Sequence, residues 1–361
     1  MNFLMPDHSA TDEVDLPRRL VLQCLATGAS LAAATGPPAL AQNAPAADSV
    51  PPAEPQSEAT NAKFVALMSE LSNWNRWGPD DQTGTVNLIT PAIRKAAAAL
   101  VREGVSFSMQ RDIELKKAAD NLEPMTLNVV HPGKGQTSRN GYTADTLLVV
   151  YHNYVQTHMN ALSHFLYEGK MYNGFSQDLV TAEAGAQKNN IMSFKNGVVT
   201  RGVLMDMARH KGVDWLEPGE AIFPADLEAW EKKARVKVRT GDIMYVRTGR
   251  SLRREKLGPW PLSDGLAGLH MDCAKWMHER GVAILGSDGD QDVRPSRVTG
   301  VGAPIHTLCL VAMGMPVFDE MDLELVGREA DKRTRWEFLT IAAPLAVPGG
   351  TGSVINPIAI F

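Results

Sequence analysis

The sequence contains few cysteines and no long apolar run. Three of its 361 residues are cysteine. Cys24 falls in a segment that we expect to be removed, which leaves Cys273 and Cys309. Two cysteines in a chain of this size do not make a disulfide framework, so we expect both to be free, with a single bridge between them as the alternative. No window reaches the roughly 18 to 20 uninterrupted apolar residues of a membrane-spanning helix.

Long basic runs and several familiar catalytic motifs are also missing. The net charge of -5 at pH 7 and the lack of a basic patch argue against nucleic acid as a partner. The sequence has no HExxH, no nucleophile elbow and no glycine-rich phosphate loop, which excludes zincin, serine hydrolase and nucleotide-binding functions of those types. Residues 349–352 (GGTG) are glycine-rich, but no lysine or helix follows them, and we interpret them as a turn.

The N-terminus predicts an export signal. Arg18 and Arg19 precede a moderately apolar stretch over residues 20–34, and the small residues Ala39 and Ala41 follow. This order is typical of a Tat-type signal peptide over residues 1–41, which predicts a bacterial periplasmic protein; the alternative is a disordered tail with a chance arginine pair. Residues 42–61 are rich in Ala, Pro and Ser and predict a flexible leader.

Residues 62–361 predict one α/β domain, because helical and strand patterns alternate without an internal repeat. Residues 116–142 are polar and contain Gly and Pro, which predicts a long loop. The expected helices cover residues 63–71, 91–103, 224–234, 273–280 and 322–330. The expected strands cover residues 105–109, 147–151, 198–205, 242–247, 282–285, 305–313 and 336–343.

The stretch from Gln156 to His164 (QTHMNALSH) carries the most chemistry. On an extended segment, side chains at even spacing point to the same face. Tyr154, His158, Asn160 and His164 would then share one face. Imidazoles that converge in this way can build a divalent metal site or supply a general base.

This stretch and several others resemble the cyclase family of metal-dependent hydrolases, which includes bacterial kynurenine formamidase and isatin hydrolase. The similarity spans about residues 70–361. It is carried by residues 74–81 (WNRWGPDD), 157–158 with 164, 165–174 (FLYEGKMYNG), 286–292 (GSDGDQD) and 348–353 (PGGTGS). The resemblance implies a single mixed sheet with flanking helices, in the swivelling β/β/α arrangement of that family.

The resemblance also implies roles for individual residues. In the family motif H-x-G-T-H-x-D-x-P-x-H, the first two histidines and the aspartate bind metal, and the last histidine is the general acid/base. His158 and His164 match the second and last histidines. Tyr154 and Asn160 stand where the first histidine and the aspartate are expected, which removes one nitrogen donor and one negative charge. His306 matches a downstream histidine near the metal or substrate, and Asp319 or Glu320 an acidic residue that joins it.

The function implied is metal-dependent hydrolysis of an amide or lactam C–N bond, with an aryl formamide of the N-formylkynurenine type as substrate. His158, Asn160 and His306 would hold Mn or Zn, and His164 would move the proton. The small-molecule substrate would lie against an aromatic wall. Its candidate residues are Trp74, Trp77, Phe165, Tyr172 and Tyr154.

Two other interpretations remain open at this stage. The first is a weakened or inactive small-molecule-binding protein on the same scaffold, in which Tyr154 could fill the metal space. The second is a hydrolase with a relocated metal site built from four histidines, namely His152, His158, His164 and His306. An extended chain argues against His152, because two residues along a strand span about 6.6 Å. The resemblance further implies a homo-oligomer.

Overall fold

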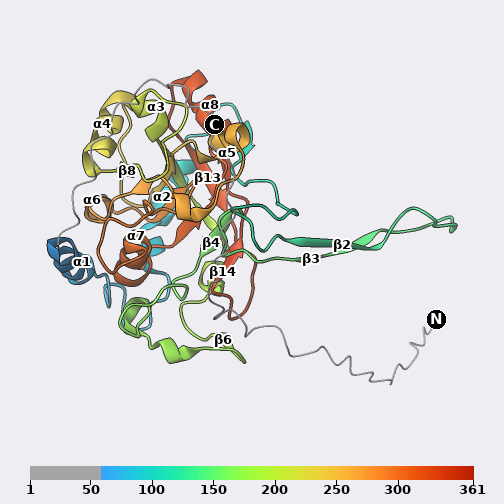
Figure 1. Ribbon diagram of the computed structural model, residues 1–361, viewed down its shortest axis with the longest axis horizontal. Coiled ribbons are helices and arrows are strands. Elements are labelled where there is room, and N and C mark those ends of the chain that lie inside the picture. Colours follow the sequence, from blue (N-terminus) through green and yellow to red (C-terminus); the bar gives the residue numbers. More distant parts are fainter. Residues whose placement is uncertain (1–57) are drawn as a thin grey trace, which may run out of the picture. The chain divides into compact units, whose positions relative to one another are not determined.

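The computed structural model describes residues 58–361 and centres on a nine-stranded mixed sheet (Figure 1). Four neighbouring strands, β7, β9, β11 and β12, run parallel, and antiparallel strands flank them on both sides. The order is β1 (Ser106–Ser108), β15 (Ile358–Ile360), β13 (Glu337–Ala342), β7 (Val198–Asp206), β9 (Ile243–Arg247), β11 (Ile284–Ser287), β12 (Val317–Asp319), β4 (His158–Asn160) and β14 (Gly352–Val354).

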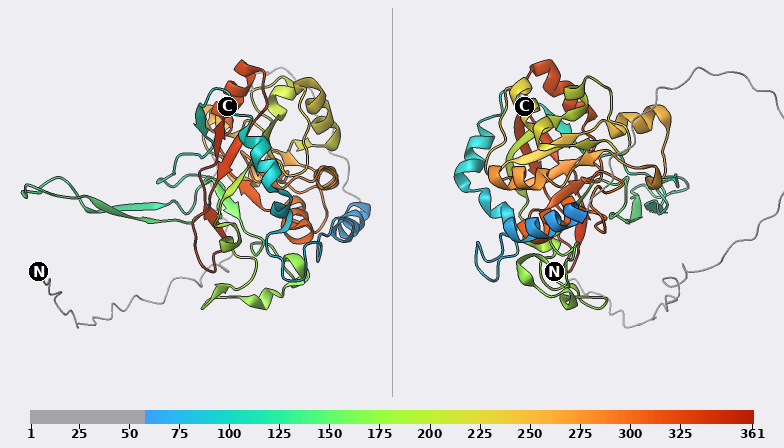
Figure 2. Two further views of the ribbon diagram at one scale, coloured as in Figure 1. Left: turned by 180° about the vertical axis from the view of Figure 1, so that it is seen from behind. Right: turned by 60° about the vertical axis from the view of Figure 1, so that its left-hand side comes forward.

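Six further strands form three small two-stranded sheets outside this main sheet. They are β8 (Ala221–Ile222) with β10 (Gly268–Leu269), β2 (Thr126–His131) with β3 (Ala144–Leu148), and β5 (Val180–Thr181) with β6 (Gly185–Ala186). The β2–β3 ribbon extends away from the rest of this unit (Figures 1 and 2).

Helices pack around the main sheet, and some of their ends are capped as the sequence predicts, although α2 ends at Ala98 rather than at residue 103. The Thr90 hydroxyl accepts a hydrogen bond from the Ile93 amide and so caps the first turn of α2. Gly281 ends α6 in the left-handed conformation, at φ +67°. The α-helices are α1 (Glu58–Glu70), α2 (Pro91–Ala98), α3 (Met207–Lys211), α4 (Pro224–Ala234), α5 (Arg250–Leu257), α6 (Cys273–Arg280), α7 (Pro304–Thr307) and α8 (Glu324–Arg333). Short helical turns complete the fold: η1 (Gly84–Leu88), η2 (Tyr172–Gly174), η3 (Gln177–Leu179), η4 (Ile191–Phe194), η5 (Leu262–Asp264) and the π-helix η6 (Leu308–Met313).

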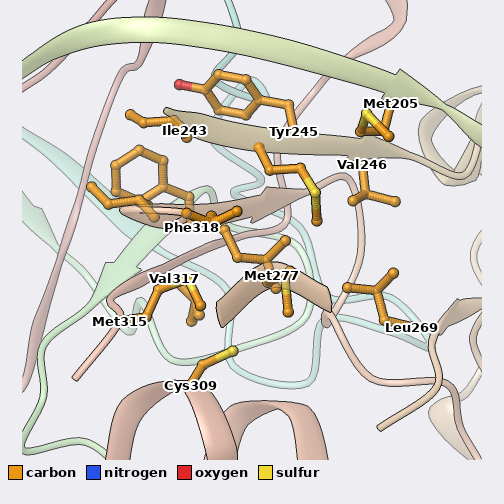
Figure 3. Close-up of a cluster of buried hydrophobic side chains, with 14 of the residues drawn as sticks. Met205, Ile243, Tyr245, Val246, Leu269, Met277, Cys309, Met315, Val317 and Phe318 are labelled. Atoms are coloured by element: carbon orange, nitrogen blue, oxygen red, sulfur yellow. The ribbon is translucent and has the colours of Figure 1, made fainter. Parts of the chain in front are cut away.

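The hydrophobic core lies between the sheet and the helices beside it. Figure 3 shows part of it, with Met205 and Val246 on strands, Met277 on α6 and Cys309 on η6. All five residues of β9 are buried, as is expected for a central parallel strand covered on both faces. The predicted α/β fold with one mixed sheet and flanking helices is therefore confirmed.

Two sequence predictions are wrong. Residues 305–313 form α7 and η6 rather than a strand, because a fully buried apolar run lacks the periodicity that separates a buried helix from a buried strand. Residues 116–142 are not one loop, since β2 lies within them and pairs with β3.

One further prediction is confirmed, and another concerns residues outside the described part of the chain. Cys273 and Cys309 are free, as predicted, and both are buried. The proposed signal peptide over residues 1–41 lies outside the described residues. None of the helices within residues 58–361 has the length and apolar character needed to cross a bilayer.

Candidate metal centre

Strand pairing brings the first site residues together. In the antiparallel pair of β4 and β12, His158 is the direct neighbour of Asp319. Directly opposed residues of an antiparallel pair project to the same face of the sheet. The distance from His158 Nε2 to Asp319 Oδ2 is 3.6 Å, and both residues are buried.

The hydrogen bonds of His158 fix which of its ring nitrogens carries the proton. Nδ1 lies 2.7 Å from the backbone oxygen of Gln156, and a carbonyl oxygen can only accept, so Nδ1 is the donor. Burial lowers the pKa of His158 and favours the neutral ring, in which Nε2 then carries a lone pair. That lone pair faces the Asp319 carboxylate. Two acceptors facing each other in a buried space need a cation or a proton between them.

His306 reaches the same carboxylate from α7. Its Nδ1 lies 2.7 Å from Asp292 Oδ2, and its Nε2 lies 3.1 Å from Asp319 Oδ2. Asp292 also accepts hydrogen bonds from the backbone amides of Ile305 and His306. It therefore orients both the first turn of α7 and the His306 ring. A carboxylate that holds Nδ1 while Nε2 points into the site is the usual outer support of a metal-binding histidine.

The charges of this cluster are strongly coupled. Burial alone would lower the pKa of His306, but the charge of Asp319 and the hydrogen bond with Asp292 outweigh burial and hold that pKa well above its usual range. Burial likewise opposes ionisation of Asp319, but His306 lowers the pKa of Asp319. Without metal, a proton on His306 Nε2 therefore occupies the contact with Asp319. A metal ion would compete with that proton.

Asp290 completes a set of three groups suited to a divalent cation. Asp290, His306 and Asp319 each offer a donor atom, and these atoms lie within 4.8 Å of one another. Two ligands on one zinc ion at about 2.1 Å are separated by up to about 4.2 Å, so small movements would close the set. Burial raises the pKa of Asp290 to about 6, with His306 as the main opposing influence. The donors therefore fit a metal chemically as well as geometrically.

Asn160 and Gln291 hold the Asp319 carboxylate from two sides. Asn160 Nδ2 donates to Asp319 Oδ2, whereas Gln291 Nε2 donates to Oδ1 at 2.9 Å. The Asn160 oxygen is buried and has no hydrogen-bond partner within residues 58–361. Three residues predicted to bind metal, His158, Asn160 and His306, thus meet at one carboxylate oxygen. Asp319, which was only one of two acidic candidates, lies at their centre.

His152 and His164 form a stacked pair beside this centre. Their ring centroids are 3.7 Å apart with an interplanar angle of 3°, and His152 lies 5.3 Å from His158 by the same measure. His152 Nε2 bonds the Thr351 hydroxyl at 3.1 Å. A Cβ at position 352 would lie 2.7 Å from the His152 ring, so only glycine fits beside it. Burial is the main cause that lowers the pKa of His152 to about 2 and that of His164 to about 3.

The chain before β4 is turned rather than extended, and this changes two expectations. The Asn153 side chain accepts the backbone amides of Val155 and Gln156, which makes a tight turn. His152 therefore reaches the cluster, although the 6.6 Å spacing of a strand argued against it. The Arg294 guanidinium lies over the Tyr154 ring, 5.6 Å from the ring centre. Arg294 also pairs with Asp290. The expectation that Tyr154 shares one strand face with His158 is wrong, because only His158–Asn160 forms a strand.

The predicted aromatic residues fall into two groups. Phe165 is partly exposed and stacks on His306, with ring centroids 5.0 Å apart. Tyr172 is completely buried, and its hydroxyl donates to Asp81 at 3.0 Å. The Trp74 indole donates to the Val311 oxygen, and Arg76 lies over the Trp77 ring. The contacts of Tyr172, Trp74 and Trp77 hold loops together, and none of them is with the histidine cluster.

Three residues of the site were not singled out from the sequence. Asp290, Gln291 and Asp292 follow β11, where the family resemblance was noted without roles. Their signal was present, because polar residues directly after a buried parallel strand collect at the carboxyl edge of a sheet, where α/β proteins place their sites.

Comparisons with known proteins agree with the α/β fold. The Cyclase family model matches residues 121–290. A crystal structure described as a novel cyclase shares 29% sequence identity and a TM-score of 0.74, over 81% of this chain and 98% of that one. Isatin hydrolase A from Ralstonia solanacearum shares 19% identity and a TM-score of 0.49, over 75% of this chain and 97% of that one. The same enzyme from Labrenzia aggregata shares 17% identity and a TM-score of 0.49, over 74% and 96%.

The chain is therefore similar to the cyclase family over residues 121–290. No curated protein sequence matches it.

Proposed function

We propose that the protein is a metal-dependent hydrolase that acts on the C–N bond of an amide or lactam, with an aryl formamide of the N-formylkynurenine type as its substrate. One observation carries the proposal. The Nε2 atoms of His158 and His306 converge on Asp319 while their Nδ1 atoms are held by Gln156 and Asp292. This arrangement is typical of metal ligands.

The metal would be held by His158, His306, Asp319 and Asp290. Two imidazoles and two carboxylates without thiolate suit Mn or Zn. When bound, such an ion lowers the pKa of a water molecule and polarises a carbonyl group. In the metal-free protein, the Asn160 amide donates a hydrogen bond to Asp319. To a cation, Asn160 can offer only a neutral oxygen.

His164 is the proposed acid/base. Burial keeps its imidazole neutral at neutral pH, so the ring can accept a proton and pass it to a leaving nitrogen. Neither of its ring nitrogens has a hydrogen-bond partner within residues 58–361. His152 limits the motion of His164 through the stacked contact and is itself held by Thr351. Phe165, which lies against both His164 and His306, provides an apolar surface for an aryl group.

A second function is favoured by Tyr154 and Asn160. Tyr154 and Asn160 replace two ligands of the family motif. Tyr154 contacts Arg294, and Asn160 lacks a charge. A site with fewer charged ligands could bind a small molecule without turning it over. Its metal would then be weakly held, and no formamide or lactam would be hydrolysed.

The experiment compares the wild type with Asn160→Asp in metal content and in hydrolysis of aryl formamides and lactams, each with added Mn or Zn. A new carboxylate beside Asp319 strengthens a cation site, so we expect metal affinity to rise about tenfold or more. Asn196→Asp, which adds the same charge at an exposed position, is the control. Hydrolysis by the wild type supports the enzyme; activity in Asn160→Asp alone supports the weakened site. Absence of metal and of hydrolysis in both proteins would refute the proposal.

We further propose that residues 1–41 direct the folded protein to the periplasm by the Tat route. The basis is the paired arginines and weakly apolar core of the sequence. Export after folding would allow the metal to be loaded in the cytoplasm. Lysine in place of both Arg18 and Arg19 should retain the protein in the cytoplasm.

A further inference from the structure

Arg294 is a cation at the edge of the proposed metal centre. Within residues 58–361, it is the only lysine or arginine that forms an ion pair with Asp290, Asp292 or Asp319, whose other ion-pair partners are histidines. Its Nε donates to Asp290 Oδ2. In the same part of the chain, neither Nη1 nor Nη2 has a hydrogen-bond partner, and the side chain is 26% exposed. The guanidinium thus reaches from a buried carboxylate to solvent with its two terminal nitrogens free.

The backbone of Arg294 is held in place. Its amide donates to the Leu266 oxygen at 2.9 Å, and the Leu266 amide donates to the Arg294 oxygen at 3.0 Å. A Cβ at position 265 would lie 2.6 Å from the same Arg294 oxygen, so glycine is needed for this close approach. The guanidinium is therefore directed from a fixed base, which reduces the entropy lost when it binds a ligand.

Tyr154 holds the other side of the guanidinium. The distance of 5.6 Å from the guanidinium carbon to the ring centre lies within the range of a cation–π contact. The Tyr154 backbone oxygen accepts a hydrogen bond from Arg250 Nη2 at 2.7 Å, which fixes the residue. The Tyr154 hydroxyl has no hydrogen-bond partner among the described residues. Tyr154 and Arg294 therefore offer unused donors beside each other.

These donors lie on the solvent side of the centre. His306 and Asp290 are buried, whereas the residues that contact them, Phe165 and Arg294, are partly exposed. His306 Nε2 lies 3.8 Å from Asp290 Oδ1, so Phe165 and Arg294 cover neighbouring groups of the centre. An aryl group on Phe165 would thus have Arg294 within reach of its substituents.

The charge of the centre requires a further cation. Asp290, Asp292 and Asp319 bring three negative charges, and a divalent ion held by neutral histidines supplies only two positive charges. Without Arg294, the loaded centre would carry a net negative charge and repel an anionic ligand. Arg294 balances that charge, and its free nitrogens remain available to an anion.

We propose that Arg294 and the Tyr154 hydroxyl bind a carboxylate of the substrate, so that the substrates are aryl amides with a carboxylate near the amide. The planar guanidinium matches a carboxylate with paired hydrogen bonds. Because Arg294 contacts Asp290 directly, a carboxylate ortho to the amide fits best. The inference rests on the proposed hydrolase function and specifies its substrate. It also gives Tyr154 a role at a position where the family motif has a histidine.

The test uses two ligands that differ in charge, ortho-aminobenzoate and ortho-aminobenzamide, neither of which has a formamide to cleave. Their binding is measured by isothermal titration calorimetry with Mn or Zn in excess. The wild type should bind the carboxylate more tightly. Arg294→Gln removes a charge-assisted pair, so it should weaken the carboxylate about tenfold or more and leave the carboxamide within about twofold. Tyr154→Phe keeps the ring and should weaken the carboxylate about fivefold.

Arg297→Gln is the matched control. Arg297 donates to the Gly219 oxygen at 2.9 Å, and it forms no ion pair with the centre among the described residues. This variant should bind both ligands as the wild type does. The metal content of each variant is measured in the same preparations. Arg294→Gln should hold at least as much metal as the wild type, because Asp290 loses a competing cation.

Three results would overturn the inference. The first is a wild type without preference for the carboxylate. The second is an Arg294→Gln variant that keeps this preference, since the carboxylate would then bind elsewhere, such as on the metal. The third is equal weakening of both ligands, since Arg294 would then only support the centre.

Failure of the proposed function gives a different result, read with ortho-formamidobenzoate. A wild type that prefers the carboxylate through Arg294 but releases no ortho-aminobenzoate from this compound lacks the hydrolase activity and keeps the binding site.

Discussion

At the scale of single residues, the centre depends on where a few protons sit. His158 is neutral with its Nε2 lone pair facing Asp319, whereas His306 carries a proton toward the same carboxylate. A metal ion would replace that proton and satisfy both acceptors at once. The stacked pair of His152 and His164 remains uncharged beside it, because burial disfavours a cation on either ring.

This burial predicts a pH dependence of stability in the metal-free protein. The folded pKa values of His152 and His164, about 2 and about 3, lie below the unfolded value of about 6.5. Below pH 6.5 the unfolded chain binds more protons, so stability is lost as pH falls from about 6.5 toward 3. Each histidine contributes at most about 1.4 kcal/mol per pH unit. Urea unfolding at pH 7, 6 and 5 measures this slope.

His164→Phe is the matched variant, because it keeps a ring in the stack and removes the titration. Its slope should be smaller than that of the wild type by up to about 1.4 kcal/mol per pH unit. An unchanged slope would show that His164 is protonated in the folded protein.

At the scale of elements, a buried ion network joins central strands of the main sheet to a helix. Arg247 at the end of β9 bonds Asp206 at the end of β7 at 2.8 Å and Glu324 at the start of α8 at 2.8 Å. All three side chains are buried. The network therefore joins two parallel strands of the sheet to a helix near its edge.

Arg247→Met should destabilise the protein by about 3–5 kcal/mol, because it leaves two buried carboxylates without their cation. Lys211→Met is the control, since Lys211 pairs with Glu220 near the surface and should cost below about 1 kcal/mol. Chemical denaturation of both variants measures the difference. Equal losses would mean that the buried network contributes no more than a surface pair.

Some of the helices and strands could be predicted from the sequence, and others could not. Helix α2 was predictable because Thr90 and Pro91 provide a local cap, and β9 because its apolar run is short and bounded by a turn. The helical form of residues 304–313 was not, since an evenly apolar segment contains no periodicity. The turn made by Asn153 was also missed, and with it the approach of His152 to the cluster.

At the scale of the whole molecule, the site depends on pairings that are distant in the sequence. His158 and His164 were predictable from a local motif, but the position of Asp319 follows from the pairing of β4 with β12. Strand order is set by the packing of the entire sheet, which no local pattern records. The sequence thus predicted the fold class, whereas the convergence of His158, Asn160 and His306 on Asp319 required the structure.

The central claim is that Asp319, with His158, His306 and Asp290, binds a divalent cation. The most direct measurement is the equilibrium metal content of the wild type and of Asp319→Asn after dialysis against Mn or Zn, with melting temperatures before and after chelation. The wild type should hold stoichiometric metal and gain about 4 kcal/mol of stability at a thousandfold excess over its dissociation constant. Asp319→Asn should lose the metal and its stabilisation while keeping the metal-free fold. A wild type that holds no metal, or a variant that holds as much, would contradict the account.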